Sequence, residues 1–148
     1  MRINLIKWGV TILPFLYMVF IWHLSSRPAD AYVYIVDDGI DGFIKESLHL
    51  IEFAILYIVS VLALAAHGKL TAATSLLVAC LSCFYGFIDE IHQSFVPYRS
   101  ATLIDAVKDV IGVVVAWSYV SFTHFRKKPT MFSNTLLWME KNVYVKEK

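Results

Sequence analysis

The sequence has little charge and few cysteines. Charged residues make up 17% of its 148 residues, and the formal net charge is only +1. No cluster of Lys and Arg alternates with aromatic residues, as a nucleic-acid-binding face would need, so nucleic acid is excluded as a partner. The two cysteines, Cys80 and Cys83, form a CxxC pair, but a βαβ context and a second ligand pair are both missing. We therefore interpret them as ordinary packing residues of an apolar segment.

Apolar residues, by contrast, are abundant. They make up 58% of the chain, with a mean hydropathy of +0.62, whereas a soluble globular protein has about 45–50%. A helix that crosses about 30 Å of hydrocarbon needs about 20 mostly apolar residues. Four stretches meet or nearly meet this length: 5–24, 48–66, 70–88 and 103–125. The sequence predicts an all-α fold, a four-helix transmembrane bundle formed by one domain of residues 1–128.

Lys and Arg residues near the ends of the predicted spans indicate their orientation. They precede the first span, lie between the second and third, and follow the fourth: Arg2, Lys7, Lys69, Arg126, Lys127 and Lys128. By the positive-inside rule these segments are cytoplasmic, so we expect both termini inside and the other two connections outside. A cleaved signal peptide ending near Ala29-Asp30-Ala31 is the alternative for the first span. It leaves the sidedness of the later spans unchanged.

Two segments outside the spans have patterns of their own. The string DDGIDG at 37–42 resembles a calcium loop but has Gly39 and Leu48 at positions where an EF-hand needs Asp or Asn and Glu. We predict a turn there, after a short strand-like run at 32–36. The tail, residues 129–148, has an apolar helical face: Phe132, Leu136, Met139 and Val143. It predicts an amphipathic cytoplasmic helix at the membrane surface, with a frayed tail as the alternative.

Ionisable residues recur at the outer ends of three predicted spans. Lys45, His49 and Glu52 are spaced i, i+4, i+7, so they share one helix face. Above a stripe of small residues, Gly86, Ser82, Ser75 and Thr71, the third span ends at Asp89. Charge in a bilayer is costly unless it is paired or lines a wet cavity. We therefore predict an outward-facing polar pocket built from Lys45, His49, Glu52, Asp89, Glu90, Gln93, Arg99, Asp105 and Asp109. A purely structural knot of salt bridges is the alternative.

These polar residues also fall in a recognisable order. Residues 89–93 read D-E-x-x-Q, residues 95–99 read F-V-P-x-R, and Asp105 and Gly112 follow. Upstream are Ser25-Ser26 and the pattern of Lys45, His49, Glu52 and Phe53. Together, from about Trp22 to Trp117, they resemble the VanZ-like family of bacterial membrane proteins. Two positions depart from the family pattern: Tyr98 stands where Gly is common, and Asp109 where Asn is usual, so Lys108 or Arg99 is expected to neutralise Asp109.

The resemblance implies a multi-pass protein of the bacterial cytoplasmic membrane. The family's named member is associated with low-level resistance to teicoplanin-type glycopeptides, drugs that bind cell-wall precursors outside the membrane. The expected partner is therefore a membrane lipid, a lipid-linked cell-wall precursor or a lipophilic glycopeptide. Whether this chain confers resistance does not follow from the resemblance.

Three mechanisms remain open for the predicted pocket. In the first, Arg99 anchors an anionic head group, because guanidinium matches phosphate and carboxylate, while the carboxylates and Gln93 hold Arg99 in place. In the second, the chain is an enzyme in which Glu52 or Glu90 acts as base and His49 carries the proton. In the third, it is an ion-coupled transporter, which the lack of polar residues in the inner halves of the spans disfavours. No cofactor or metal is expected, because H-x-x-E at 49–52 is a weak metal motif, even with Asp89 and His92 added.

Overall fold

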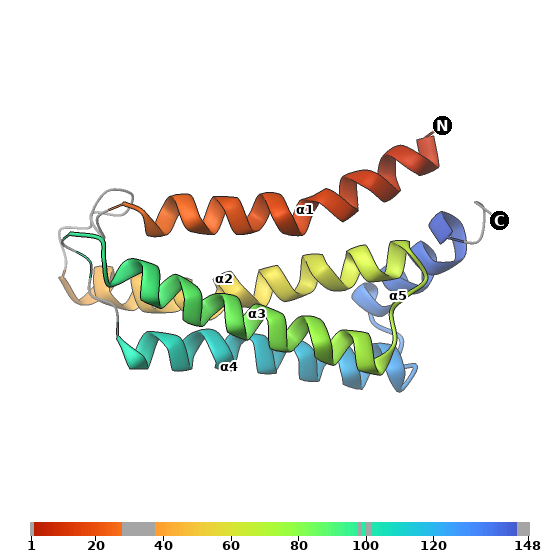
Figure 1. The fold of residues 1–148 in the computed structure, drawn as a ribbon. Helices are drawn as coiled ribbons and strands as arrows, with labels where there is room; N and C mark the ends of the chain where they lie inside the picture. The colour runs from red at the N-terminus through yellow and green to blue at the C-terminus, as the bar shows by residue number, and fades with distance from the viewer. Residues whose placement is uncertain (1, 28–37, 98, 100–101, 145–148) are drawn as a thin grey trace.

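The computed structural model describes residues 2–27, 38–97, 99 and 102–144, and all regular structure in these residues is helical. Its elements in order are α1 (Arg2–Ser25), α2 (Asp38–Ala66), α3 (Ala72–Gln93), α4 (Leu103–Val120), η1 (Ser121–Phe125), α5 (Met131–Met139) and η2 (Glu140–Tyr144). Four long helices lie side by side, and the chain begins and ends at the same end of the bundle (Figure 1). The predicted all-α class and the bundle of four long helices are confirmed.

The four predicted spans overlap the four long helices, with one large difference in extent. Helix α2 begins at Asp38 instead of residue 48, so the turn predicted at 37–42 is wrong for the described residues 38–42. Acidic residues interact favourably with a helix N-terminus. The residue types in the sequence at the start of α2, with aspartate at 38 and 41, are compatible with this preference. The strand predicted at 32–36 lies outside the described residues.

Threonine side chains set the starts of three helices. Thr71, Thr102 and Thr130 each have extended backbone and accept a hydrogen bond from the backbone N–H three residues later, at 3.1 Å in every case. This satisfies one of the N–H groups that a helix N-terminus leaves without a partner. The turn between α2 and α3 contains Gly68 with a φ of 60°, a left-handed conformation that glycine adopts without strain.

The core lies around α2, which packs against the other three long helices. Phe53, Tyr57, Val61 and Ala65 follow one face of α2 and are completely buried. On α3 three residues of the predicted small-residue stripe, Ser75, Ser82 and Gly86, are buried, as are Ala79 and Asp89 on the same helix, but Thr71 caps the helix and is exposed. The Tyr57 hydroxyl is 2.8 Å from Ser75 Oγ, so this polar stripe is hydrogen-bonded within the core.

Two helices of the described part are long and apolar enough to cross a membrane by length and composition: Leu5–Ser25 and Ala72–Gln93. A third apolar helix, Leu50–Ala66, is shorter. Helix α1 buries little of its surface and exposes large apolar side chains such as Leu5, Phe15 and Val19. These features are consistent with a membrane protein, because exposed apolar surface of this extent is unusual in water.

The tail forms the helix that its apolar spacing predicts. Leu136, Met139 and Val143 are buried and Phe132 is partly buried, all against the core of the bundle. An added Cβ at Gly68 would lie 2.4 Å from the Tyr144 ring, so the tail reaches the α2–α3 turn. The predicted apolar face therefore covers the end of the bundle. Its placement on a membrane surface stays a prediction.

Candidate functional site

Arg99, in the connection between α3 and α4, is held by three neutral oxygen atoms. Its Nε donates to Gln93 Oε1 at 2.9 Å, and its Nη1 donates to the backbone oxygens of Leu24 and Arg27, each at 3.1 Å. Leu24 lies in the last turn of α1 and Arg27 follows the end of the helix. A helix leaves oxygens without helical partners at its C-terminal end and carries partial negative charge there. Arg99 thus fastens the end of α1 to the end of α3.

Asp89 and Gln93 are buried next to Arg99 and support it. They are four residues apart on α3, so they lie on one helix face, and each is only 1% exposed. Asp89 Oδ2 accepts hydrogen bonds from Ser25 Oγ at 2.8 Å and from Gln93 Nε2 at 2.5 Å. The Gln93 amide uses both its ends, donating to Asp89 and accepting from Arg99. We call Ser25, Asp89, Gln93 and Arg99 the Arg99 cluster.

No carboxylate of the described residues lies within salt-bridge distance of Arg99. The sequence predicts that several carboxylates hold Arg99 in place. None of the described carboxylates binds it directly. Asp89 reaches Arg99 only through the neutral amide of Gln93. In addition, Arg99 Nη2 makes no hydrogen bond within the described residues. Within the described residues, therefore, no direct ion pair compensates the positive charge of the guanidinium, and Nη2 has no acceptor there.

Glu90 and Asp105 meet instead at the start of α4. Glu90 Oε2 accepts from the backbone N–H of Thr102 at 3.2 Å, and Asp105 Oδ2 accepts from Thr102 Oγ1 at 2.6 Å. Lys108 pairs with Asp105 at 3.0 Å. Carboxylates are favourable at a helix N-terminus. Glu90 and Asp105, both predicted to bind ligand, therefore stabilise the N-terminus of α4 in the folded chain.

Asp109 on α4 and Glu52 on α2 lie farther from the end of the bundle than Arg99 does. Asp109 is 1% exposed and packs against α3, where an added Cβ at Gly86 would lie 3.3 Å from Asp109 Cβ. The same Cβ would lie 3.7 Å from Phe53, the residue that follows Glu52. The missing side chain at Gly86 thus leaves room for the Asp109 carboxylate between α2, α3 and α4. Lys108, expected to neutralise Asp109, makes its recorded pair with Asp105.

Some predicted site residues cannot be placed by their side chains. Lys45 and His49 lie in the helical backbone of α2, but their side chains, like all of Tyr98, are outside the described part of the chain. The acid–base mechanism with His49 therefore stays a prediction. Among the described residues no group of three His, Cys, Asp or Glu side chains could hold a metal ion.

The structure adds two features that the sequence reasoning missed. Ser25 donates a hydrogen bond to Asp89. The sequence predicts no contact for Ser25, which is only part of the family resemblance. Beside it, the Trp22 and His92 rings stack with centroids 3.8 Å apart, and His92 Nε2 is 3.0 Å from Ser26 Oγ. The signal for both was the Ser25-Ser26 pair at the end of the first span, because short hydroxyl side chains there can reach a neighbouring helix.

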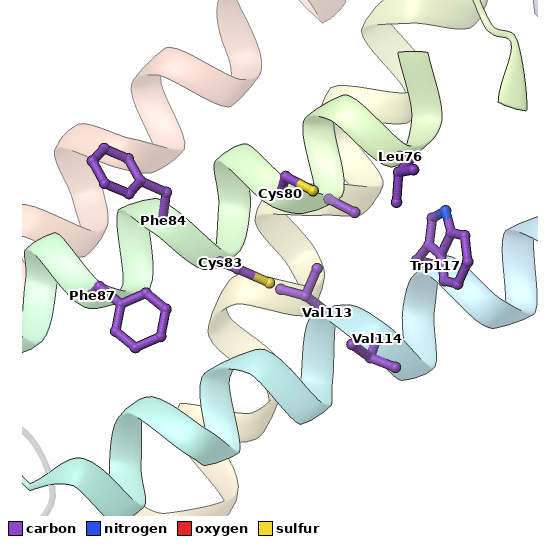
Figure 2. A pocket seen from close by; sticks show the side chains of 9 residues that line it. Leu76, Cys80, Cys83, Phe84, Phe87, Val113, Val114 and Trp117 are labelled. Atoms are coloured by element: carbon purple, nitrogen blue, oxygen red, sulfur yellow. The ribbon is translucent and has the colours of Figure 1, made fainter. Parts of the chain in front are cut away.

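An apolar groove of about 430 Å³ lies between α3 and α4 (Figure 2). None of its lining residues belongs to the Arg99 cluster. Phe84 and Phe87 on α3 and Val114 and Trp117 on α4 are among the side chains that line it. Cys80 and Cys83 point into the same space and are free thiols (Figure 2). This groove is not the polar pocket predicted from the sequence, which stays a prediction.

These observations define a class of protein: an all-α bundle with apolar helices and a hydrogen-bonded polar cluster at the end opposite its termini. The VanZ/LLP1 family model matches residues 3–124, and the chain belongs to this family. No curated protein and no solved structure matches the chain significantly.

Proposed function

We propose that this chain is a multi-pass protein of the bacterial cytoplasmic membrane that binds an anionic head group at its outer surface. The ligand is a lipid-linked cell-wall precursor or a lipophilic glycopeptide of the teicoplanin type. Arg99 is the anchor of that head group. Family membership and the apolar helices support the membrane location.

The observation that carries this proposal is the state of Arg99. A partly buried charge is normally compensated by an opposite charge, yet the partners of Arg99 are an amide oxygen and two carbonyls. Such partners orient the guanidinium without cancelling its charge. A phosphate or carboxylate that reaches Nη2 would complete the site with a charge-assisted hydrogen bond.

Resistance to teicoplanin would follow if the site held the drug, or its lipid-linked target, away from the growing wall.

The enzymatic alternative uses Glu52 or Glu90 as base on the same head group. It receives less support, because Glu90 Oε2 is engaged by the N-terminus of α4. Incubating purified protein with lipid-linked precursor distinguishes the two, since only an enzyme yields a product of changed mass that Glu52→Gln abolishes.

The binding proposal is tested by replacing Arg99 in full-length protein purified in detergent. Binding of a lipid-linked wall precursor, and separately of teicoplanin, is measured by native mass spectrometry. Arg99→Lys keeps the charge but loses the planar fork, so we expect about tenfold weaker binding, equivalent to about 1.4 kcal/mol. Arg99→Ala should bind more weakly still.

Arg2→Lys is the matched control, because it makes the same substitution at the start of α1, at the other end of the bundle. Each variant must reach the membrane fraction in normal amount and elute as native protein does. If correctly inserted Arg99→Lys and Arg99→Ala bind both probes as tightly as the native chain, the proposed role of Arg99 is wrong.

A further inference from the structure

Three consecutive cations form an exposed turn where the fourth long helix ends. Arg126, Lys127 and Lys128 follow η1, and all three are exposed. Lys127 has a φ of 54°, and the N–H of Lys128 donates to Thr123 O at 2.8 Å, so the chain reverses sharply at this point. No carboxylate of the described residues pairs with any of the three cations. Their positive charge is therefore available to a partner.

The turn is organised around an exposed aromatic ring. Arg126 Cζ lies 5.5 Å and Lys128 Nζ 5.9 Å from the centroid of Phe122, whose side chain is 51% exposed. Both distances are in the range of cation–π attraction. Two charges are thus held close to an apolar ring that is itself exposed.

Phe122 continues an apolar strip along α4. Val115, Tyr119 and Phe122 are exposed and lie at helical spacing, and Arg126 follows four residues later on the same face. The strip therefore changes from aliphatic through aromatic to cationic within about three turns. That order matches a bilayer leaflet, which changes from hydrocarbon through an interface preferred by aromatic rings to charged phosphates.

We propose that residues 122–128 dock on the head groups of anionic phospholipids at the cytoplasmic surface of the bilayer. Phe122 enters the interface, and Arg126 and Lys128 each meet a lipid phosphate from beside the ring. Each Lys or Arg near an anionic leaflet strengthens its attraction by about fivefold. This site is separate from the Arg99 cluster, which lies at the opposite end of the bundle (Figure 1).

The test uses the full chain in nanodiscs with equal amounts of phosphatidylglycerol and phosphatidylcholine. The lipids retained by the protein after extraction are counted by native mass spectrometry. We expect native protein to retain phosphatidylglycerol preferentially, and the Arg126→Gln/Lys128→Gln variant to lose about fivefold of that preference per cation removed. Lys141→Gln, which removes an exposed cation from the tail, is the control and should retain the native preference.

Four outcomes would overturn the proposal. In the first, native protein shows no preference for the anionic lipid, and in the second, the double variant keeps the native preference. In the third, the double variant unfolds at a lower temperature in pure phosphatidylcholine but retains phosphatidylglycerol normally, which would show that the cations serve only the helix end. Binding of soluble glycerol phosphate in neutral detergent, dependent on residues 126 and 128, would also contradict it by showing a site for free phosphate.

Discussion

Gln93 is the residue on which the Arg99 cluster depends. Its amide nitrogen donates to Asp89 and its amide oxygen accepts from Arg99 Nε, so one neutral side chain separates an acid from a base. An amide can donate at one end and accept at the other while remaining uncharged. The cluster therefore holds two opposite charges close together without letting them cancel in a direct ion pair.

This arrangement predicts the effect of Gln93→Glu. The new carboxylate would face Asp89 without a proton donor and would pair directly with Arg99. We expect the free energy of unfolding in detergent to fall by about 2 kcal/mol, and binding of the lipid-linked precursor to weaken as the charge on Arg99 is compensated. Gln93→Met, similar in size and uncharged, is the control for lost hydrogen bonds alone. Native stability and native affinity in Gln93→Glu would contradict this role.

At the scale of the elements, the contact between α2 and α4 is set by one glycine. A Cβ added at Gly112 would lie only 1.9 Å from the backbone oxygen of Leu50. Such a contact cannot be relieved by a side-chain rotation, because the obstacle is main chain. The two helices approach closely because Gly112 has no side chain, in the way that small residues commonly allow in helix bundles of membranes.

Gly112→Ala should therefore force α2 and α4 apart. We expect a loss of about 1–3 kcal/mol in stability, the usual cost of overpacking, measured as a lower unfolding temperature in detergent. Gly9→Ala is the matched control, since nothing lies within 4 Å of a Cβ added there. That control should be neutral or slightly stabilising, because alanine favours helix more than glycine does. Equal unfolding temperatures for the two variants would show that α2 and α4 are not held at this distance.

For the whole molecule, charge divides along the bundle axis. At the end that holds the termini, the described residues are mainly basic, and Glu140 is an acidic residue among them. The basic residues are Lys7, Lys69, Arg126, Lys127, Lys128 and Lys141. Glu140 is itself 3.5 Å from His124. The opposite end carries Asp89, Glu90 and Asp105, with the cations Arg27, Arg99 and Lys108 beside them. This asymmetry supports the proposed orientation, with the basic end in the cytoplasm.

Cysteine labelling tests that orientation. Cys80 and Cys83 are first replaced by serine, and a single cysteine is then introduced by Ser94→Cys at the acidic end or Pro129→Cys at the basic end, both at exposed positions. A maleimide that cannot cross membranes should label the first in intact cells and the second only after permeabilisation. The reverse pattern would invert the topology and place Arg99 in the cytoplasm.

Much of the fold could be predicted from local sequence patterns. Apolar runs gave the four long helices, and the spacing of Leu136, Met139 and Val143 gave the tail helix with its buried face. The start of α2 was missed because Gly39 and Gly42 suggest a turn, although aspartate, the residue type at 38 and 41, is favoured near a helix N-terminus. In the local sequence the glycines favour a turn and the aspartates favour a helix start, and in the structure this segment is helical.

The sequence by itself determined which residues are polar in an apolar chain, and helical spacing determined which of them share a face. The tertiary structure decided how they pair. Glu90 and Asp105 meet at Thr102, and Gln93 rather than a carboxylate contacts Arg99. The reason is that pairing depends on distances of about 3 Å between side chains of different helices. Those distances follow from how closely the helices pack at Gly86 and Gly112, which no pattern within a single helix contains.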